Sequence, residues 1–328
     1  GAMGQISTLL KAVIATSLTM QALLAVMFLP RFLNMGIDPA HAVWDAVFMA
    51  ISVFNNAGFV ILPGGLEPHV TDWWMLVPII LGTTVGAIGF PVIMDVAKNL
   101  RAPRRWRLHT KLTLSTYLIL AFIGALALAL TEWHNPATLG SVDTPSKILN
   151  AMLAGVNSRS SGLSALNVGA MHSQTHFVQD ILMMIGGGSA STAGGVKVTT
   201  FAVLVLAVIA EARGDRDIET FGRRIPTSTV RLAVAVSLLG LAMVAISVVL
   251  LLTMTDHSLD IILFETVSAF ATVGLSTGVT PNLPVAAKYV LIALMFAGRT
   301  GSMTVAAALA LRERSRVIRM PEEQPIIG

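Results

Sequence analysis

The chain has 328 residues, of which 54% are hydrophobic and 12% are charged, and its formal net charge at pH 7 is +4. Soluble globular domains carry about 25% charged residues, so this composition excludes an ordinary soluble protein and indicates an integral membrane protein. The chain contains no cysteine, which excludes disulfides and thiolate metal sites.

Six stretches are long and apolar enough to cross a bilayer, since a transmembrane helix needs about 20 mostly apolar residues. They cover residues 6–30, 74–97, 110–131, 177–211, 228–254 and 288–311. We expect Pro91 to kink the second of them. Three further apolar runs are too short to span and are predicted to be helices that re-enter the membrane. These runs cover residues 42–54, 146–156 and 259–271.

The basic residues predict the orientation. Of the 22 Lys and Arg residues, 16 fall at Lys11 or within 98–111, 213–231 and 312–319. By the positive-inside rule these segments are cytoplasmic, which predicts a multi-pass protein of the cell membrane with its three short helices entering from outside. A nucleic-acid surface is the alternative for the basic loops. The ordinary insertion signal explains them, so we predict no nucleic-acid partner.

Each short apolar run ends in a turn of small residues that contains one glycine. The turns are 54–59 (FNNAGF), 157–163 (NSRSSGL) and 271–276 (ATVGLS), and their glycines Gly58, Gly162 and Gly274 lie 104 and 112 residues apart. Glycine permits backbone angles closed to other residues, so successive carbonyls can face a pore and replace the hydration shell of a cation. An ordinary loop glycine explains any one turn but not the repetition. The pattern therefore favours a cation filter.

A glycine-rich stretch interrupts the fourth span, where residues 186–195 read GGGSASTAGG. Each glycine costs a helix about 1 kcal/mol relative to alanine, so we predict a helix, a loop within the membrane and a second helix. Hydroxyl groups in the loop could satisfy freed backbone groups or meet a passing ion. A kinked helix packed through small residues is the alternative. A phosphate-binding loop fits poorly, because its glycine-lysine spacing and preceding strand are absent.

Two arginines lie close to the predicted ion path. Arg159 is inside the second turn, and we predict that its guanidinium points away from the pore and donates to carbonyls behind the filter. Arg299 lies within the last span, where a charge normally pairs or faces water. We predict that it forms a barrier below the filter or holds the glycine-rich stretch, which would make that stretch a gate. Lys197 can reach the interface by snorkelling and ranks below Arg299.

The sequence gives no sign of catalysis. The seven histidines lack metal-binding spacing, and neither a Ser-His-Asp arrangement nor a pair of carboxylates stands out. We therefore predict no enzyme activity and no metal site apart from the transported ion.

At these residues the chain resembles the Trk/Ktr/HKT superfamily of potassium transporters, in particular the ion-conducting KtrB/TrkH-type subunit. The matching stretches are 52–59 (SVFNNAGF), 86–92 (GAIGFPV), 187–198 (GGSASTAGGVKV), 267–276 (VSAFATVGLS) and 295–301 (MFAGRTG). They follow the family's order over most of the chain.

The resemblance implies an all-α polytopic membrane protein built of M1–P–M2 units, each a helix, a re-entrant pore helix with its filter turn and a second helix, around a pseudo-fourfold pore. Potassium would be the transported substrate, and no nucleotide would bind this chain. The implied filter residues are Asn56, Ala57, Gly58, Ser160, Ser161, Gly162, Thr272, Val273 and Gly274. The implied gate comprises Gly187, Gly188, Ser189, Ser191, Thr192, Gly194 and Gly195 together with Arg299.

Three such units are expected in this chain, at residues 1–105, 106–223 and 224–328. The family has four, and by order this chain matches the second, third and fourth. The first unit and its filter strand are missing, so we expect a fragment or a truncated form that does not conduct alone. Potassium against sodium selectivity therefore stays open. The resemblance also implies a homodimer in lipid that binds a cytosolic nucleotide-binding RCK-type regulatory subunit (KtrA/TrkA-like).

Two alternatives from other classes stay open. A cation-coupled secondary transporter also uses broken helices, but it does not account for three turns on one side and should show stoichiometric co-transport. A non-conducting membrane scaffold that binds a cytosolic partner through its basic loops should be indifferent to substitution of the filter glycines.

Overall fold

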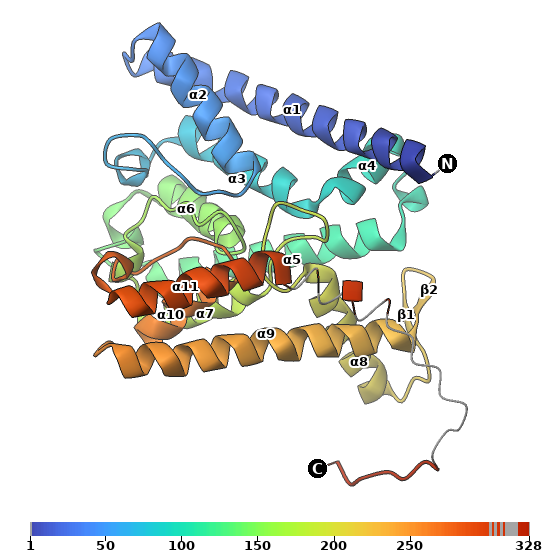
Figure 1. Ribbon diagram of the computed structural model, residues 1–328. Helices are drawn as coiled ribbons and strands as arrows, with labels where there is room; N and C mark the ends of the chain where they lie inside the picture. Colours follow the sequence, from blue (N-terminus) through green and yellow to red (C-terminus); the bar gives the residue numbers. More distant parts are fainter. Residues whose placement is uncertain (1, 302–303, 305–306, 309–310, 312–320, 328) are drawn as a thin grey trace.

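The computed structural model describes residues 2–301, 304, 307–308, 311 and 321–327. This part of the chain consists mainly of long helices that run side by side, with shorter helices between them (Figure 1). The helices are α1 (Ala2–Asn34), α2 (Pro39–Phe54), α3 (Trp73–Ile88), α4 (Phe90–Lys98), α5 (Leu108–Glu132), α6 (Thr144–Asn157), α7 (Ser173–Met184), α8 (Val198–Arg213), α9 (Thr227–Met254), α10 (Leu259–Phe270) and α11 (Val285–Phe296). The predicted all-α class is confirmed.

The order of elements repeats three times. A long helix, a short helix and a shorter or broken helix follow one another as α1–α2–α3/α4, α5–α6–α7/α8 and α9–α10–α11. The three short helices match the predicted re-entrant runs, and each packs against the long helix before it. One antiparallel pair, β1 (Ile218–Thr220) and β2 (Arg223–Ile225), was not predicted, and the unit boundary placed after residue 223 cuts through it.

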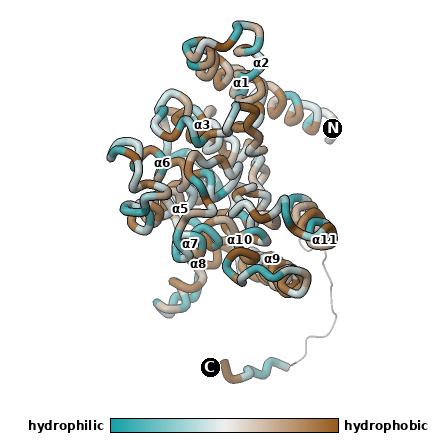
Figure 2. Tube along the Cα trace, turned by 90° about the vertical axis from the view of Figure 1, so that its left-hand side faces the viewer, coloured by the Kyte–Doolittle hydropathy of each residue, from teal (hydrophilic) through white to brown (hydrophobic). Residues whose placement is uncertain are grey.

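Three described helices, α1, α5 and α9, are each long and apolar enough to cross a membrane. Figure 2 shows hydrophobic residues along the peripheral helices α1 and α9. Side chains such as Leu18, Leu130 and Ile246 are more than 60% exposed in the isolated chain. Such faces need lipid or further protein to cover them. Both the loop 99–107 and the loop 214–226, which carries the hairpin, lie at the right of Figure 1, and we call this side of the molecule the basic end.

The predicted span 74–97 is not one continuous helix, and its interruption is sharper than the predicted kink. It divides into α3 and α4, which meet at 96°. Gly89 forms the break with φ +97°, a backbone angle that other residues rarely adopt. Pro91 follows within the first turn of α4, where its missing N–H costs nothing. The predicted kink is therefore a complete break that begins two residues earlier.

The fourth predicted span behaves as expected. It consists of α7 and α8, joined by a non-helical segment that includes residues 186–195. The last predicted span begins with α11 and continues as a π-helix over Ala297–Gly301. The further residues predicted for it at 302–303, 305–306 and 309–310 lie outside the described residues.

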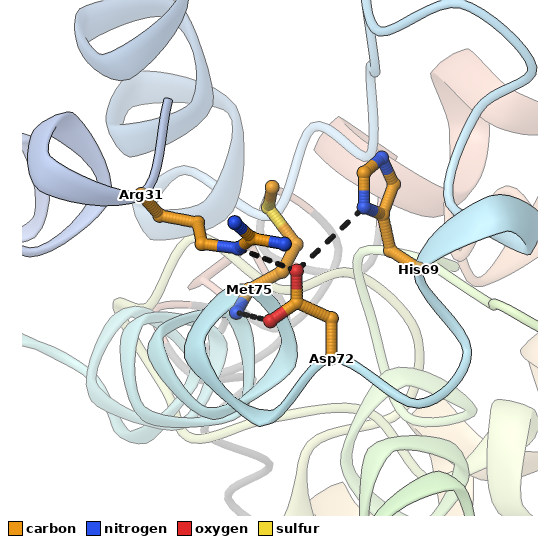
Figure 3. Close-up of polar contacts among 4 residues, drawn as sticks. All are labelled: Arg31, His69, Asp72 and Met75. Atoms are coloured by element: carbon orange, nitrogen blue, oxygen red, sulfur yellow. Dashed lines mark hydrogen bonds and ion pairs between the residues drawn. The ribbon is translucent and has the colours of Figure 1, made fainter. Parts of the chain in front are cut away.

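Three carboxylates organise the end of the molecule opposite the basic end. Asp72 joins the end of α1 to the start of α3, because its Oδ2 pairs with Arg31 Nε at 2.7 Å and His69 Nδ1 at 3.7 Å (Figure 3). Its Oδ1 accepts from Met75 N at 3.2 Å and caps α3. A carboxylate at a helix N-terminus is also favoured by the helix dipole.

Glu132 and Glu265 are buried carboxylates surrounded by neutral donors. Glu132 connects the loop after α5 to the start of α7. It accepts hydrogen bonds from the side chains of Asn135, Thr138 and Thr175 and from the backbone N of His172. Glu265 accepts from Ser276 Oγ at 2.9 Å, Thr277 N at 2.7 Å, Thr277 Oγ1 at 2.8 Å and Thr280 Oγ1 at 2.6 Å. It therefore anchors the segment that follows the third glycine turn.

The structure predicts that Glu265→Ala destabilises the full-length protein. Leaving a buried donor unsatisfied costs about 1–3 kcal/mol, and the substitution removes the acceptor for four donor groups. We expect a clear fall in the thermal unfolding midpoint in detergent and a smaller fall for Glu265→Gln, which keeps one acceptor oxygen. Asp256→Ala, at an exposed acid of the same region, is the control. Equal midpoints for Glu265→Ala and Asp256→Ala would contradict the anchoring role.

Candidate functional site

The first turn (54–59) and the third turn (271–276) have the same backbone path. Asn56 N and Thr272 N each donate to the carbonyl three residues back, at 3.2 and 3.1 Å, and Ala57 N and Val273 N each donate five residues back, at 2.9 Å. The middle of each turn alternates between left-handed and ordinary backbone. φ is +53° at Asn56 and +52° at Thr272, and it is +75° at Gly58 and +99° at Gly274.

The second turn (157–163) differs. Here the left-handed residues are adjacent, Ser161 with φ +74° and Gly162 with φ +66°. The hydrogen bond that closes this turn also spans five residues, from Gly162 N to Asn157 O, but its length is 3.2 Å rather than 2.9 Å. Residues 157–161 are all buried. The hydroxyl oxygens of Ser160 and Ser161 are enclosed without a hydrogen-bond partner among the described residues.

The three turns meet at their glycines. A Cβ atom at Gly58 would overlap the carbonyl of Ser161, and a Cβ atom at Gly162 would overlap the carbonyl of Val273. At Gly274 a Cβ atom would lie 3.6 Å from the Ser161 carbonyl oxygen. The structure therefore brings the nine predicted filter residues together. There is no room for a side chain at Gly58, where the first turn contacts the second, or at Gly162, where the second turn contacts the third.

The glycine-rich stretch 186–195, hereafter the glycine segment, lies against the break between α3 and α4. Gly188 N donates to Ala87 O at 2.7 Å, Thr192 N donates to Gly86 O at 3.2 Å, and Phe90 N donates to Ala190 O at 3.4 Å. A helix end leaves its last carbonyls without intrahelical partners. The break at Gly89 thus creates the acceptors that the non-helical segment uses.

Thr192 joins the glycine segment to the first turn. Its hydroxyl lies 3.0 Å from both Phe54 O and Gly86 O, and it accepts from Asn56 Nδ2 at 2.5 Å. Gly86 permits this close approach because it has no side chain, and a Cβ atom there would overlap Phe54 O. Thr192 is thus in direct contact with the end of α2 and with a predicted filter residue.

Glycines in the segment allow equally close approaches elsewhere. A Cβ atom at Gly194 would overlap the hydroxyl of Thr272 in the third turn. Cβ atoms at Gly187 and Gly188 would overlap the carbonyls of Ala87 and Ile88. Gly195 is left-handed with φ +77°. The two serines of the predicted gate make local contacts, Ser189 Oγ with Thr199 Oγ1 at 3.3 Å and Ser191 Oγ with Ala193 N at 3.2 Å.

Arg159 joins the glycine segment to the second turn. Its side chain is completely buried. Nε donates to Ile185 O at 2.7 Å, Nη2 donates to Gly186 O at 2.6 Å, and Nη1 donates to Tyr117 O at 3.3 Å. The guanidinium also lies over the Tyr117 ring, 4.8 Å from its centroid. Among the described residues no carboxylate pairs with it, so carbonyl dipoles and an aromatic face surround the charge.

Two further cations, Lys197 and Arg299, lie close to the glycine segment or to the third turn. Arg299 belongs to the π-helix, and its Nη1 donates to Thr272 Oγ1 at 3.3 Å. Single-turn π-helices often occur at functional sites. Lys197 Nζ donates to Ala193 O at 2.7 Å. In the described part of the chain it is therefore Lys197, which sequence reasoning ranked lower, that bonds to a carbonyl of the segment, while Arg299 reaches the third turn.

Each turn thus has its own contact with the glycine segment or its neighbours. Asn56 meets Thr192, Arg159 meets Ile185 and Gly186, and Thr272 meets Gly194. The sequence did not reveal that Tyr117 contacts Arg159, or that the α3 carbonyls of Gly86 and Ala87 accept hydrogen bonds from the glycine segment. The only available signal for the latter was the spacing of Gly86, Gly89 and Pro91. Within the described residues, no three His, Asp or Glu side chains are grouped as metal ligands.

Comparison with known proteins gives the family. Residues 2–318 match the model of the TrkH family, described as cation transport proteins. The chain is similar to the Ktr system potassium uptake protein B of Bacillus subtilis, with 36% identity over all of this chain and 72% of that protein. It is also similar to the protein of the same name from Vibrio alginolyticus, with 34% identity over 86% of this chain and 62% of that protein.

The fold has a solved counterpart. The crystal structure of the potassium transporter TrkH from Vibrio parahaemolyticus superimposes with a TM-score of 0.72 over 94% of this chain and 65% of that chain, at 18% identity. The chain therefore spans between about three fifths and three quarters of the length of these proteins. A family match across nearly the whole chain and the two relatives agree on a transporter rather than an enzyme, and this chain belongs to the TrkH family of cation transport proteins.

Proposed function

We propose that this chain supplies most of the pore-forming subunit of a Ktr/Trk-type potassium uptake system in the cell membrane. The observation that supports it most directly is the meeting of three glycine turns at the ends of three short helices, with the glycine segment in contact with each of them. The names of the relatives from Bacillus subtilis and Vibrio alginolyticus, both potassium uptake proteins, support potassium as the ion.

In the proposed filter, potassium binds to backbone carbonyls of the three turns. The alternation of left-handed and ordinary residues at 56–58 and 272–274 turns successive carbonyls away from their helical directions, so they are free to coordinate an ion. Helices α2, α6 and α10 end at these turns, and the negative end of a helix dipole favours a cation. In the four-unit arrangement that the family resemblance implies, a fourth turn would join the three of this chain.

In the proposed gate, the glycine segment closes the path next to the filter. Its closed position is held by Thr192 against α2, by Lys197 on Ala193 O and by Arg159 on Ile185 and Gly186. Arg299, placed at Thr272, adds a positive charge beside the third turn. Opening requires these hydrogen bonds to be exchanged for others or for water.

The remaining parts of the proposal concern the full-length protein. The basic end faces the cytoplasm by the positive-inside rule, and potassium moves inward down its electrochemical gradient. We further propose that a homodimer and a cytosolic nucleotide-binding RCK-type subunit complete the system. The names of both relatives, each one component of a Ktr system, support the presence of partner proteins. A cation-coupled secondary transporter remains the competing function, because α3/α4 and α7/α8 are broken helices of the kind such transporters use.

The filter proposal predicts a graded effect of serine at the turn glycines. Gly58→Ser must displace the Ser161 carbonyl. At Gly274 a Cβ atom would make only an ordinary 3.6 Å contact with Ser161 O, so Gly274→Ser acts through its positive φ and added hydroxyl. In the full-length protein we expect Gly58→Ser to abolish potassium-dependent growth of an uptake-deficient bacterium. Gly274→Ser should leave growth that is weakened by sodium.

The matched control for this pair is Gly278→Ser. Gly278 has φ +97°, close to the +99° of Gly274, and open space around it. Normal growth with Gly278→Ser separates filter effects from simple backbone strain. Normal, sodium-insensitive growth with both filter variants would rule out the turns as the ion path, and a fixed ion stoichiometry would favour the secondary transporter.

The gate proposal predicts that Lys197→Met and Arg299→Ala raise rubidium flux into liposomes when the regulatory subunit is absent. A hydrogen bond from a charged group contributes about 1.5–3 kcal/mol, so loss of the Lys197 bond should shift the closed-to-open ratio about tenfold or more. Lys147→Met, which removes a similar lysine-to-carbonyl bond to Trp133 O at the opposite end, should leave flux unchanged. Unchanged or reduced flux in folded Lys197→Met and Arg299→Ala proteins would exclude this gate.

The proposed role of Arg159 predicts a looser glycine segment in Arg159→Lys. Lysine keeps the charge but lacks the planar fork that reaches two carbonyls at once. A cysteine at Ser191, unique in this cysteine-free chain, should react several times faster with a soluble thiol reagent in Arg159→Lys. A cysteine at the exposed Gln174 should react equally fast in both backgrounds. Equal rates at Ser191 would show that Arg159 does not hold the segment closed.

A further inference from the structure

A concave site lies at the basic end, away from the turns. A cavity of about 410 Å³ lies between the loop 99–107, the start of α5 and the tip of the β1–β2 hairpin. Five of its lining residues are cationic, and no acidic residue lines it. The cations are Arg104, Arg105, Arg107, Lys111 and Arg223.

These five cations have little carboxylate around them, and Asp95 interacts electrostatically with Arg107 alone among them. Among the described residues, none of them forms an ion pair, and the one ion pair of the nearby hairpin joins Arg224 to Asp217, outside the cavity lining. Asp95 approaches the backbone of this loop, where its Oδ2 accepts from Arg107 N at 2.8 Å. Lys111 Nζ donates to Arg104 O at 3.3 Å. Topology alone requires basic loops but not their arrangement around one cavity, so the arrangement indicates an anionic ligand.

The hairpin holds an exposed aromatic residue beside these charges. Phe221 is 52% exposed and occupies the left-handed first position of a two-residue turn, with φ +49°, before Gly222 at φ +72°. Such turns favour asparagine, aspartate or glycine at that position, and a bulky residue with positive φ is a marked outlier. Folding of the hairpin therefore does not explain Phe221.

The hairpin is fixed in place by its other face. Ile218 and Ile225 pack into an apolar cluster with residues of α5, α8 and α9, among them Leu112, Ala202 and Ala233. In Figure 1 the hairpin lies at the same end of the molecule as the start of α5. Phe221 and Arg223 are consequently presented to the loop 99–107 by a packed element rather than by a free loop.

The cavity also lies where the membrane surface is expected. Helix α5 is a candidate span that begins at Leu108, and Leu108 itself lines the cavity beside Trp106. The Trp106 indole donates to Asn99 O at 3.1 Å, which fixes its ring. Aromatic rings next to Lys and Arg at the start of a span are typical of the headgroup layer, and basic pockets at this level can bind lipid phosphate.

We propose that this cavity binds the phosphate of an anionic phospholipid headgroup, with Phe221 and Trp106 at the acyl side of that headgroup. An exposed aromatic residue at the tip of a basic hairpin favours a lipid over a free anion, which gains nothing from Phe221. It likewise favours a lipid over an acidic protein surface, which does not require a cavity at the level where a span begins. The site is separate from the proposed ion path.

Trp106 lines the cavity, so quenching of its fluorescence reports lipid binding at this site. The full-length protein in mixed micelles is titrated with phosphatidylglycerol or phosphatidylcholine carrying brominated acyl chains, and quenching is taken as the difference between the parent and Trp106→Phe. The other tryptophans of this chain, at positions 44, 73, 74 and 133, cancel in that difference. From the quenching of Trp106, we expect the apparent affinity for phosphatidylglycerol to be at least tenfold higher than that for phosphatidylcholine.

Two triple variants of equal charge separate the cavity from the general basic surface. Arg104→Gln/Arg105→Gln/Arg223→Gln removes three lining cations, and Arg213→Gln/Arg216→Gln/Arg224→Gln removes three nearby cations outside the lining. Each basic residue at an anionic surface contributes roughly fivefold in affinity. We expect the first triple to lose the preference for phosphatidylglycerol and the second to keep it. Equal losses would show non-specific attraction and overturn the site.

Phe221→Asn is the variant that cannot fail through misfolding of the hairpin, since asparagine suits the left-handed turn better than phenylalanine. We expect it to weaken phosphatidylglycerol quenching while leaving the protein folded. Inorganic phosphate at millimolar concentration should not displace the lipid, and full displacement would assign the site to a free anion. Lipid quenching that stays intact in the cavity triple, with loss of regulatory-subunit binding, would assign the surface to a protein partner instead.

Discussion

The structure depends on the need of every buried backbone N–H and C=O for a partner where water is absent. The glycine segment 186–195 is neither helix nor strand, so its polar groups must be satisfied by other parts of the chain. Amides of Gly188 and Thr192 find the carbonyls of Ala87 and Gly86. The carbonyls of Ile185 and Gly186 find the guanidinium of Arg159. Without these partners an unwound segment at this depth would be unstable.

The break between α3 and α4 and the interruption between α7 and α8 are therefore structurally linked, although they are distant in sequence. The break at Gly89 frees the carbonyls of α3, and the interruption between α7 and α8 supplies amides to meet them. Close contact needs positions without side chains, which accounts for glycine at positions 86, 187, 188 and 194. An alanine at any of these positions would push a carbonyl or hydroxyl away. Each interruption thus supplies hydrogen-bonding groups that the other uses.

Local signals in the sequence were enough for the helices and for the interruption of the fourth span. Hydrophobic length gave α1, α5 and α9, and the run of glycines at 186–195 gave the unwound segment. The β1–β2 hairpin was missed because its strands are three residues each and its turn carries Phe221 rather than asparagine. The role of Lys197 and the partners of Arg159 depend on contacts between residues that are distant in sequence or on the path of the loop, which composition does not encode. The assignment of filter and gate residues stays a prediction.

The hydrogen bond between Asn56 and Thr192 has a thermodynamic consequence. It joins a residue of the proposed filter to a residue of the proposed gate with no intermediary, so any movement of one changes the energy of the other. Linkage makes such an effect reciprocal. Under the proposed function, an ion that reorients the first turn on binding would shift the balance between open and closed gate, and opening would alter ion affinity by the same factor. Selectivity and gating would then be a single coupled equilibrium rather than two independent barriers in series.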